Sequence, residues 1–170
     1  MVALKNNKGF SLVETMTVIG IVAIMGTFAV PPMISWLQNK GLNSAARDLY
    51  SNMRKAQSIA VKNNRNCVVS FDGATGYTVY VDMNKNYVHD AGEEMIAQVI
   101  WSQYNNMRLA QPVNFDNSSG KPSIAFQPNL IPADKGGGIA NGTINLESTA
   151  NARKADIAIS VSGNISLDWQ

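Results

Sequence analysis

Four of the 12 acidic side chains in this 170-residue sequence lie between residues 82 and 94. Positions 1, 3, 5, 7, 9 and 12 of a twelve-residue frame are occupied by Asp82, Asn84, Asn86, Val88, Asp90 and Glu93. This is the spacing of an EF-hand calcium loop, in which position 7 supplies a backbone carbonyl and position 12 a bidentate carboxylate. Position 6 is Tyr87, where such a loop needs glycine, and strands rather than helices are expected on either side. The pattern therefore leaves two interpretations, a calcium site and an acidic turn held by side-chain hydrogen bonds to the backbone.

No group of residues in the sequence predicts a catalytic site. The single histidine, His89, belongs to no nucleophile motif and is expected to be an exposed loop residue. The single cysteine, Cys67, excludes an internal disulfide and is expected to be a small buried hydrophobic residue. The run Gly136-Gly137-Gly138 lacks the Lys-Ser/Thr of a P-loop and is expected to form a loop. We therefore expect no enzyme, and no cofactor apart from the calcium considered above.

Glu14 is the only charged residue in Phe10–Val30, a 21-residue apolar run. At about 1.5 Å per residue, this run spans roughly 30 Å, the hydrocarbon thickness of a bilayer. Lys5 and Lys8 precede it and are expected to stay cytoplasmic. A secretory signal peptide would be followed by a small-residue cleavage site, of which Thr27-Phe28-Ala29 is a poor version. A plain anchor leaves Glu14 unexplained, because an acid inside a membrane helix costs on the order of 2.5–3.5 kcal/mol on insertion scales.

The segment from Lys8 to Thr15, KGFSLVET, resembles the processing motif of type IV prepilins. The resemblance implies that a peptidase cuts between Gly9 and Phe10 and that Phe10 is then N-methylated. It also implies that Glu14 pairs with the N-terminal amine of a neighbouring subunit in a filament. Such a pair would offset the burial cost of both charges in a low-dielectric environment.

The helix is expected to continue beyond the apolar run. Pro31-Pro32 predicts a kink or a short unwinding. Apolar residues then recur at steps of three and four, which is typical of one face of a helix: Leu42, Ala45, Leu49, Met53, Ala56 and Ala60. Asn63-Asn64 is expected to end it. By resemblance to pilins, residues 1–9 would form the leader, 10–36 a transmembrane and filament-core helix, and 37–65 an amphipathic helix that packs on a head.

From residue 66 onward the pattern changes to that of strands. Cys67–Phe71 and Tyr77–Val81, separated by the turn at 72–76, predict a β-hairpin. Further strands are expected at Met95–Trp101, Val113–Phe115, Ser123–Phe126, Thr143–Leu146, Asp156–Val161 and Asn164–Leu167. The expected fold class is therefore α+β, with a long membrane-spanning N-terminal helix packed on a mainly antiparallel β head at 66–170, as in pilins.

Three segments narrow the resemblance to the GspH/FimT family, which comprises minor pseudopilin H of type II secretion and related minor pilins. These segments are Ala56–Arg65, Gly76–Asp82 and Asp82–Glu94. The resemblance implies a structural minor pseudopilin in a helical filament that supports protein export. It would be anchored once in the bacterial inner membrane with its head in the periplasm. Its partners would be other pseudopilins or pilins, the prepilin peptidase and the inner-membrane assembly platform.

The alternative is a minor type IV pilin of the FimT kind, which acts in pilus assembly or DNA uptake. DNA-binding members resemble one another in a Gly-Arg-x-Arg ending. This sequence has Gly163-Asn164-Ile165-Ser166 there, and Arg153-Lys154 is the nearby basic pair. Because the net charge is only +2, nucleic acid is not an expected partner. Arg153 and Lys154 would be its contacts in this alternative.

Overall fold

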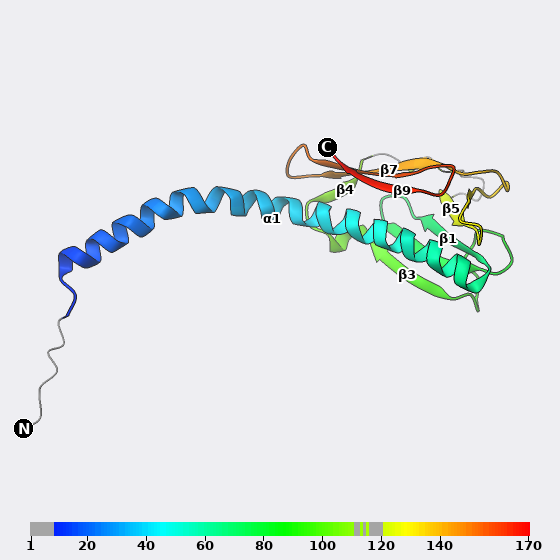
Figure 1. The fold of residues 1–170 in the computed structure, drawn as a ribbon, viewed down its shortest axis with the longest axis horizontal. Coiled ribbons are helices and arrows are strands. Elements are labelled where there is room, and N and C mark those ends of the chain that lie inside the picture. The colour runs from blue at the N-terminus through cyan, green and yellow to red at the C-terminus, as the bar shows by residue number, and fades with distance from the viewer. Residues whose placement is uncertain (1–8, 111–112, 114, 116–120) are drawn as a thin grey trace, which may run out of the picture. The chain divides into compact units, whose positions relative to one another are not determined.

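One helix dominates the N-terminal part of the chain (Figure 1). The computed structural model describes residues 9–110, 113, 115 and 121–170, with the backbone alone at 29–32. Helix α1 runs without interruption over Leu12–Asn63, 52 residues, so no unwinding occurs at Pro31-Pro32. The chain divides into two compact units after Leu37, and each is described by itself.

Both ends of α1 are capped by side-chain and backbone hydrogen bonds. At the start, the Glu14 N–H donates to Ser11 Oγ over 3.1 Å, the bond made by a Ser-x-x-Glu capping box. At the end, Asn64 has φ 49° and its N–H donates to the Val61 carbonyl, while the Arg65 N–H donates to the Ala60 carbonyl. This is a Schellman ending with asparagine in the left-handed position, and it confirms the predicted helix end.

The head, within Gln38–Gln170, consists of antiparallel strands packed on the second half of α1. Within the described residues, the first sheet has the order β3-β2-β1-β5-β6 and the second the order β4-β7-β8-β9. The first contains β1 (Asn66–Phe71), β2 (Gly76–Asp82), β3 (Met95–Ile100), β5 (Ser123–Phe126) and β6 (Pro132–Ala133). The second contains β4 (Met107–Leu109), β7 (Gly142–Ser148), β8 (Lys154–Ile159) and β9 (Ile165–Trp169). The α+β fold class is therefore confirmed.

A single large core joins the helix to both sheets. All six residues of the predicted helical stripe are at most 1% exposed. They pack with strand residues such as Phe71, Ile144 and Ile157. Burying each large aliphatic side chain contributes about 1.5–3 kcal/mol, which is why the stripe fixes the face that α1 turns to the sheets. Cys67 is fully buried in this core, as predicted.

Some strand predictions are wrong. Val113 and Phe115 lie in no strand, and Asn114 between them is outside the described residues. Both are buried, and the Phe115 ring lies 6.0 Å from the Phe71 ring, so their alternation reflects core packing. Trp101 begins a 3-10 helix, η1 (Trp101–Gln103), instead of ending a strand. The short strands β4 and β6 were not predicted.

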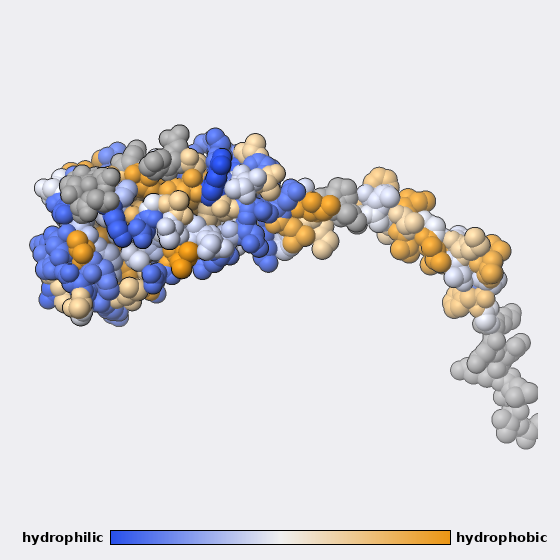
Figure 2. All heavy atoms as spheres, turned by 180° about the vertical axis from the view of Figure 1, so that it is seen from behind, coloured by the Kyte–Doolittle hydropathy of each residue, from blue (hydrophilic) through white to orange (hydrophobic). Residues whose placement is uncertain are grey.

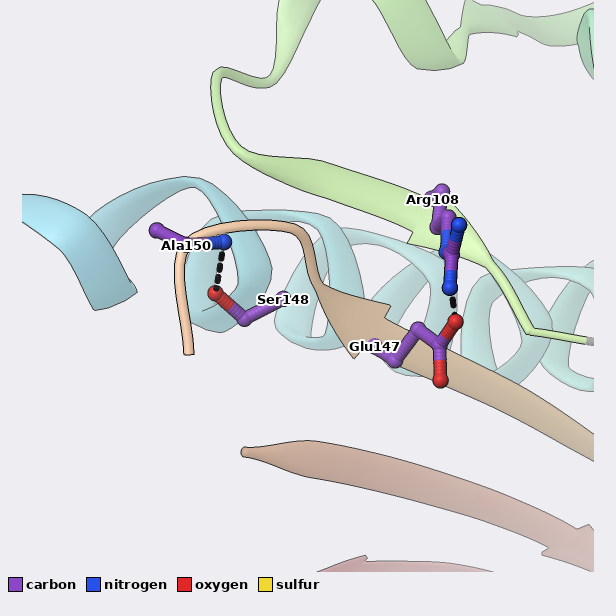
Figure 3. Close-up of polar contacts among 4 residues, drawn as sticks. All are labelled: Arg108, Glu147, Ser148 and Ala150. Atoms are coloured by element: carbon purple, nitrogen blue, oxygen red, sulfur yellow. Dashed lines mark hydrogen bonds and ion pairs between the residues drawn. The ribbon is translucent and has the colours of Figure 1, made fainter. Parts of the chain in front are cut away.

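Strand β4 is held to β7 by an exposed ion pair (Figure 3). Arg108 Nε and Glu147 Oε1 lie 2.5 Å apart on partner positions of the two strands. In the adjoining turn, the Ala150 N–H donates to Ser148 Oγ. Because the Arg108 side chain is 67% exposed, this pair contributes less than about 1 kcal/mol and mainly sets the register.

Strand β3 forms an open edge of the first sheet, since no described strand pairs with it beyond β2. Its sequence, MIAQVI, contains no charge, proline or glycine. Met95 and Ile100 are 45% and 49% exposed.

Candidate assembly and binding surfaces

The predicted cleavage site lies in an exposed segment ahead of the helix. Gly9 and Phe10 precede the first helical residue, Leu12, and the Phe10 side chain is 84% exposed. A Cβ built on Gly9 would meet nothing within 4 Å. A peptidase could therefore reach this peptide bond without unwinding α1. The rest of the leader, residues 1–8, lies outside the described residues.

Glu14 lies in the first turn of α1, one turn from the predicted new N-terminus. Its side chain is exposed and forms no hydrogen bond or ion pair with any described residue. The Ser11 hydroxyl caps the backbone N–H of Glu14, so the carboxylate remains available to a partner outside the chain. Sequence reasoning missed the cap at Ser11, although the Ser-x-x-Glu spacing could have revealed it.

The apolar run forms a helical surface with no protein cover. Large side chains from Leu12 to Phe28 are 54–78% exposed. Among the described helices, α1 is long and apolar enough to cross a membrane, by length and composition. Figure 2 shows hydrophobic residues along this first part of α1, whereas hydrophilic residues predominate on the head. Such a surface needs lipid or neighbouring apolar helices around it.

The exposed face of the second half of α1 carries bases and serines. The six residues lie within an arc of about 100° at the helical repeat, and they are Arg47, Ser51, Arg54, Lys55, Ser58 and Lys62. The Arg54 guanidinium donates to the Ile165 carbonyl over 3.2 Å. Nearby, the Gln57 amide donates to the Gly163 carbonyl over 2.6 Å, so both side chains tie the β8–β9 hairpin to the helix. Arg47, Lys55 and Lys62 have no partner among the described residues. We call these six residues the basic face.

The loop after β2 is held together by bonds from its own carboxylates and amides. Buried Asp82 accepts the N–H groups of Lys85 and Tyr87 over 2.6 and 3.0 Å. Glu93 Oε1 accepts the Met83 N–H, and its Oε2 accepts the Asp90 N–H. These are the side-chain-to-backbone bonds of the turn interpretation.

Asp90 is bound to the two asparagines of the calcium frame. Its Oδ2 accepts the amide groups of Asn84 over 2.8 Å and Asn86 over 2.7 Å. The Asn84 bond, followed by the Asn86 bond, lowers the pKa of Asp90 from 3.8. The described residues contain no group of three His, Cys, Asp or Glu side chains placed to hold a metal. The turn geometry thus accounts for the loop as it stands, and calcium binding by Asp82, Asn84, Asn86, Val88, Asp90 and Glu93 stays a prediction.

The residues considered for catalysis have no catalytic surroundings. His89 is exposed, as predicted, and lies with its ring edge-on 5.2 Å from that of Tyr80. Burial raises the pKa of Cys67 to about 12, which leaves the thiol protonated and unreactive. The glycine run at 136–138 forms a turn in which Gly138 N–H donates to Asp134 Oδ1, and it leads into no helix.

The basic pair considered for DNA lies at the start of β8. The Arg153 guanidinium stacks on the Trp169 ring at 5.1 Å, and Lys154 occupies a ladder position opposite Glu147. Gly163 lies in the β8–β9 turn with φ 80°. An alanine Cβ at Gly163 would lie 2.1 Å from the Leu130 carbonyl oxygen, so this glycine serves a close backbone approach.

Comparison with known proteins identifies the chain. Residues 45–163 match the family of type II transport protein GspH, and residues 4–30 match the prokaryotic N-terminal methylation motif. The chain belongs to the GspH family. The resemblance drawn from the motifs is thereby confirmed, and the match extends through most of the head. GspH-family proteins are pilin-like structural proteins rather than enzymes, and the methylation motif implies processing by prepilin peptidase and assembly with other pilins.

Two individual proteins are similar to this GspH-family chain. The pilin-like protein PilA1 of Thermus thermophilus is 29% identical over 163 residues, which are 95% of this chain and 98% of that protein. The crystal structure of the type IV minor pilin FimU of Pseudomonas aeruginosa aligns with a TM-score of 0.53 at 15% identity. The alignment covers 78% of this chain and 92% of FimU, and it supports the pilin-like fold.

Proposed function

We propose that this chain is a structural minor pseudopilin of a type II secretion filament. It is cut between Gly9 and Phe10, methylated on Phe10 and anchored in the inner membrane by the first part of α1, with its head in the periplasm. It then joins a helical filament that supports protein export. The observation that carries the proposal is the first part of α1, an exposed apolar helix in which Glu14, one turn from the cleavage site, has no partner among the described residues. The family description, type II transport protein, favours the secretion filament.

Glu14 performs the proposed assembly step through electrostatics. Cleavage creates an ammonium on Phe10, just ahead of the cap at Ser11. In a filament core of low dielectric, an unpaired ammonium and an unpaired carboxylate each carry a large burial cost. A neighbouring subunit that places its Glu14 against this amine removes both costs. Subunits out of axial register leave both charges unpaired, so the pair also sets the stagger between neighbours.

Processing and assembly have separate measurements. The intact mass of protein from the native membrane should show loss of Met1–Gly9 and one added methyl group. Glu14→Ala should leave the subunit in the membrane and absent from sheared filaments. Ser11→Ala is the matched control, because it removes the helix cap and keeps the acid, and it should assemble. Normal incorporation of Glu14→Ala, or an intact leader, would contradict the proposal.

A second candidate is a minor type IV pilin, and the likeness to PilA1 favours it, since that relative is named as a pilin-like protein. In this reading the chain would act in pilus assembly or DNA uptake, with Arg153 and Lys154 as nucleic-acid contacts. A deletion strain distinguishes the two: the secretion proposal requires loss of exoprotein export, and the pilus reading requires loss of pili or of DNA uptake. DNA binding by the purified chain that falls steeply with salt, and disappears in Arg153→Ala/Lys154→Ala, would favour the pilus reading.

A further inference from the structure

Two adjoining hollows form a groove at the end of the head where α1 ends. Their volumes are about 420 and 290 Å³, and Asn66, Lys85 and Pro128 line both. Three segments far apart in sequence build the walls: the α1–β1 junction at 64–66, the loop after β2 at 82–87, and the loop at 127–137. We call this feature the end groove. Its size lies in the range of pockets that hold ligands.

The end groove presents basic and amide groups without internal partners. Arg65, Lys85 and Lys135 line it, and their side chains form no ion pair or hydrogen bond with any described residue. Asn66 is only 7% exposed, lines both hollows, and its side-chain amide is also unpartnered within the described chain. The Asn66 amide is not among the buried groups that lack a hydrogen-bond partner, so its polar atoms reach the groove, where they can bind a ligand that carries polar groups.

The acids at the end groove are already engaged. Asp82 is 1% exposed, and both of its oxygens accept backbone N–H groups of the loop. Asp134 Oδ1 accepts the Gly138 N–H over 2.7 Å. Both acids keep their negative charge, so the lining carries three bases against two acids, and the bases are the groups exposed to solvent.

Three residues at the walls adopt the left-handed backbone conformation, which is ordinary for the asparagine that ends α1 and unfavourable for the other two. Among the described residues other than glycine, five have positive φ, and three of them line the end groove: Asn64 at 49°, Lys85 at 61° and Tyr87 at 61°. A left-handed conformation costs roughly 1–2 kcal/mol for an ordinary residue and persists only where surrounding bonds enforce it. The Tyr87 hydroxyl supplies one such bond, donating to the Asp134 carbonyl over 2.6 Å and tying two walls together.

We infer that the end groove binds an extended acidic segment of a partner protein. Bases neutralise Asp, Glu or terminal carboxylates, and a side-chain amide can both donate to and accept from a peptide backbone. Lys62, the last residue of the basic face, lies three residues before Arg65 in the sequence. Nucleic acid fits less well. Protein grooves that bind single-stranded nucleic acid combine basic side chains with exposed aromatic rings. Tyr87, the one aromatic residue that lines the end groove, is only 6% exposed. The inference goes beyond the proposed function and holds for either kind of filament.

Fluorescence anisotropy with labelled oligoglutamate tests the inference on the full chain in non-ionic detergent, with oligoglutamine as the neutral control peptide. The groove variant is Lys85→Asn/Lys135→Gln, where asparagine is chosen because it tolerates the positive φ of Lys85. The matched control, Arg153→Gln/Lys154→Gln, removes the same charge from β8. Oligoglutamate should bind saturably, and the groove variant should weaken binding up to about tenfold, the scale of two exposed ion pairs. The control variant should bind as the unaltered chain does. Asn66→Ser, which keeps the charge, should also weaken binding.

Several results would overturn the inference. Absence of saturable oligoglutamate binding is one, and equal weakening by the two double variants is another, because it would reduce the effect to net charge. Displacement of the peptide by equimolar inorganic phosphate would reduce the groove to a small-anion site. Tighter binding of oligothymidylate, lost in the groove variant, would assign the groove to nucleic acid.

Discussion

Gly41 offers a sharp test of the head's packing, because helix propensity and tertiary structure predict opposite effects of an alanine there. Gly41 is buried in α1, where an alanine Cβ would lie 1.7 Å from the Asn105 carbonyl oxygen and 2.7 Å from its carbon. Ordinary contact begins at 3.4 Å, so the backbone between η1 and β4 would have to move. Gly20 and Gly26 belong to the same helix, and a Cβ at either would meet nothing within 4 Å.

The expected magnitude follows from two opposing contributions. Alanine is favoured over glycine in a helix by about 1 kcal/mol. Overpacking costs typically about 1–3 kcal/mol, and the upper end applies here because the obstacle is backbone rather than a flexible side chain. We therefore expect Gly41→Ala to destabilise the head by about 1–2 kcal/mol, which lowers the unfolding midpoint by roughly 3–10 °C.

Cys67 provides the assay. It is the only cysteine, it is fully buried, and burial raises its pKa to about 12, so a thiol-reactive dye labels it only when the head opens. Thermal labelling of the full chain in detergent should show a lower midpoint for Gly41→Ala. Gly20→Ala and Gly26→Ala should leave the midpoint unchanged, since neither alters the head. A midpoint for Gly41→Ala at or above that of the unaltered chain would refute the close approach.

Three further predictions concern the loop after β2 and the β8–β9 hairpin. Asn84→Ala should raise the pKa of Asp90 toward 3.8, as measured by NMR titration, because it removes the first of the two amide bonds that lower it. Because the pKa of Asp90 is lowered on folding, the stability that this carboxylate contributes is present above pH 3.8 and is lost as the pH falls through its pKa in the folded state. An Asp90 pKa that is the same in Asn84→Ala as in the unaltered chain would contradict the bond. If the loop is a calcium site, isothermal titration calorimetry of the full chain with millimolar calcium should give a heat of binding that Asp90→Asn abolishes. Even weak extracellular calcium sites bind at about 10⁻⁴–10⁻³ M, so the absence of heat would favour the turn interpretation. Gln57→Ala should destabilise the head by about 1–3 kcal/mol in the same labelling assay, because the Gly163 carbonyl loses its 2.6 Å bond, and an unchanged midpoint would show that water replaces the amide.

Much of the fold could be predicted because its signals are local. The helical stripe, the Asn63-Asn64 ending and the first hairpin each depend on spacing within a short window. Strand β4 could not be predicted this way. It has three residues, and its partner β7 lies almost forty residues further along the chain. The strand predicted at Val113–Phe115 is wrong because alternating apolar residues indicate burial. The alternation does not distinguish a strand from an irregular segment packed on the core.

The candidate functional sites also differ in whether the sequence could locate them. The cleavage site and Glu14 could be located from sequence because a contiguous motif carries them. The end groove could not, since Arg65, Lys85 and Lys135 come to line it only after the first sheet has formed. Gly41 likewise looks like an unfavourable residue in a helix until the Asn105 backbone is seen against it.

The open edge at β3 makes the head a template. Among the described strands only β2 pairs with these six residues, which include none of the lysines or prolines that usually deter strand addition. Short, uncharged segments of this composition nucleate cross-β stacking when many copies meet in solution. Confinement by a membrane anchor would keep such encounters rare, and the irregular register between Ala97 and Met95 interrupts the edge, as β-bulges at sheet edges do.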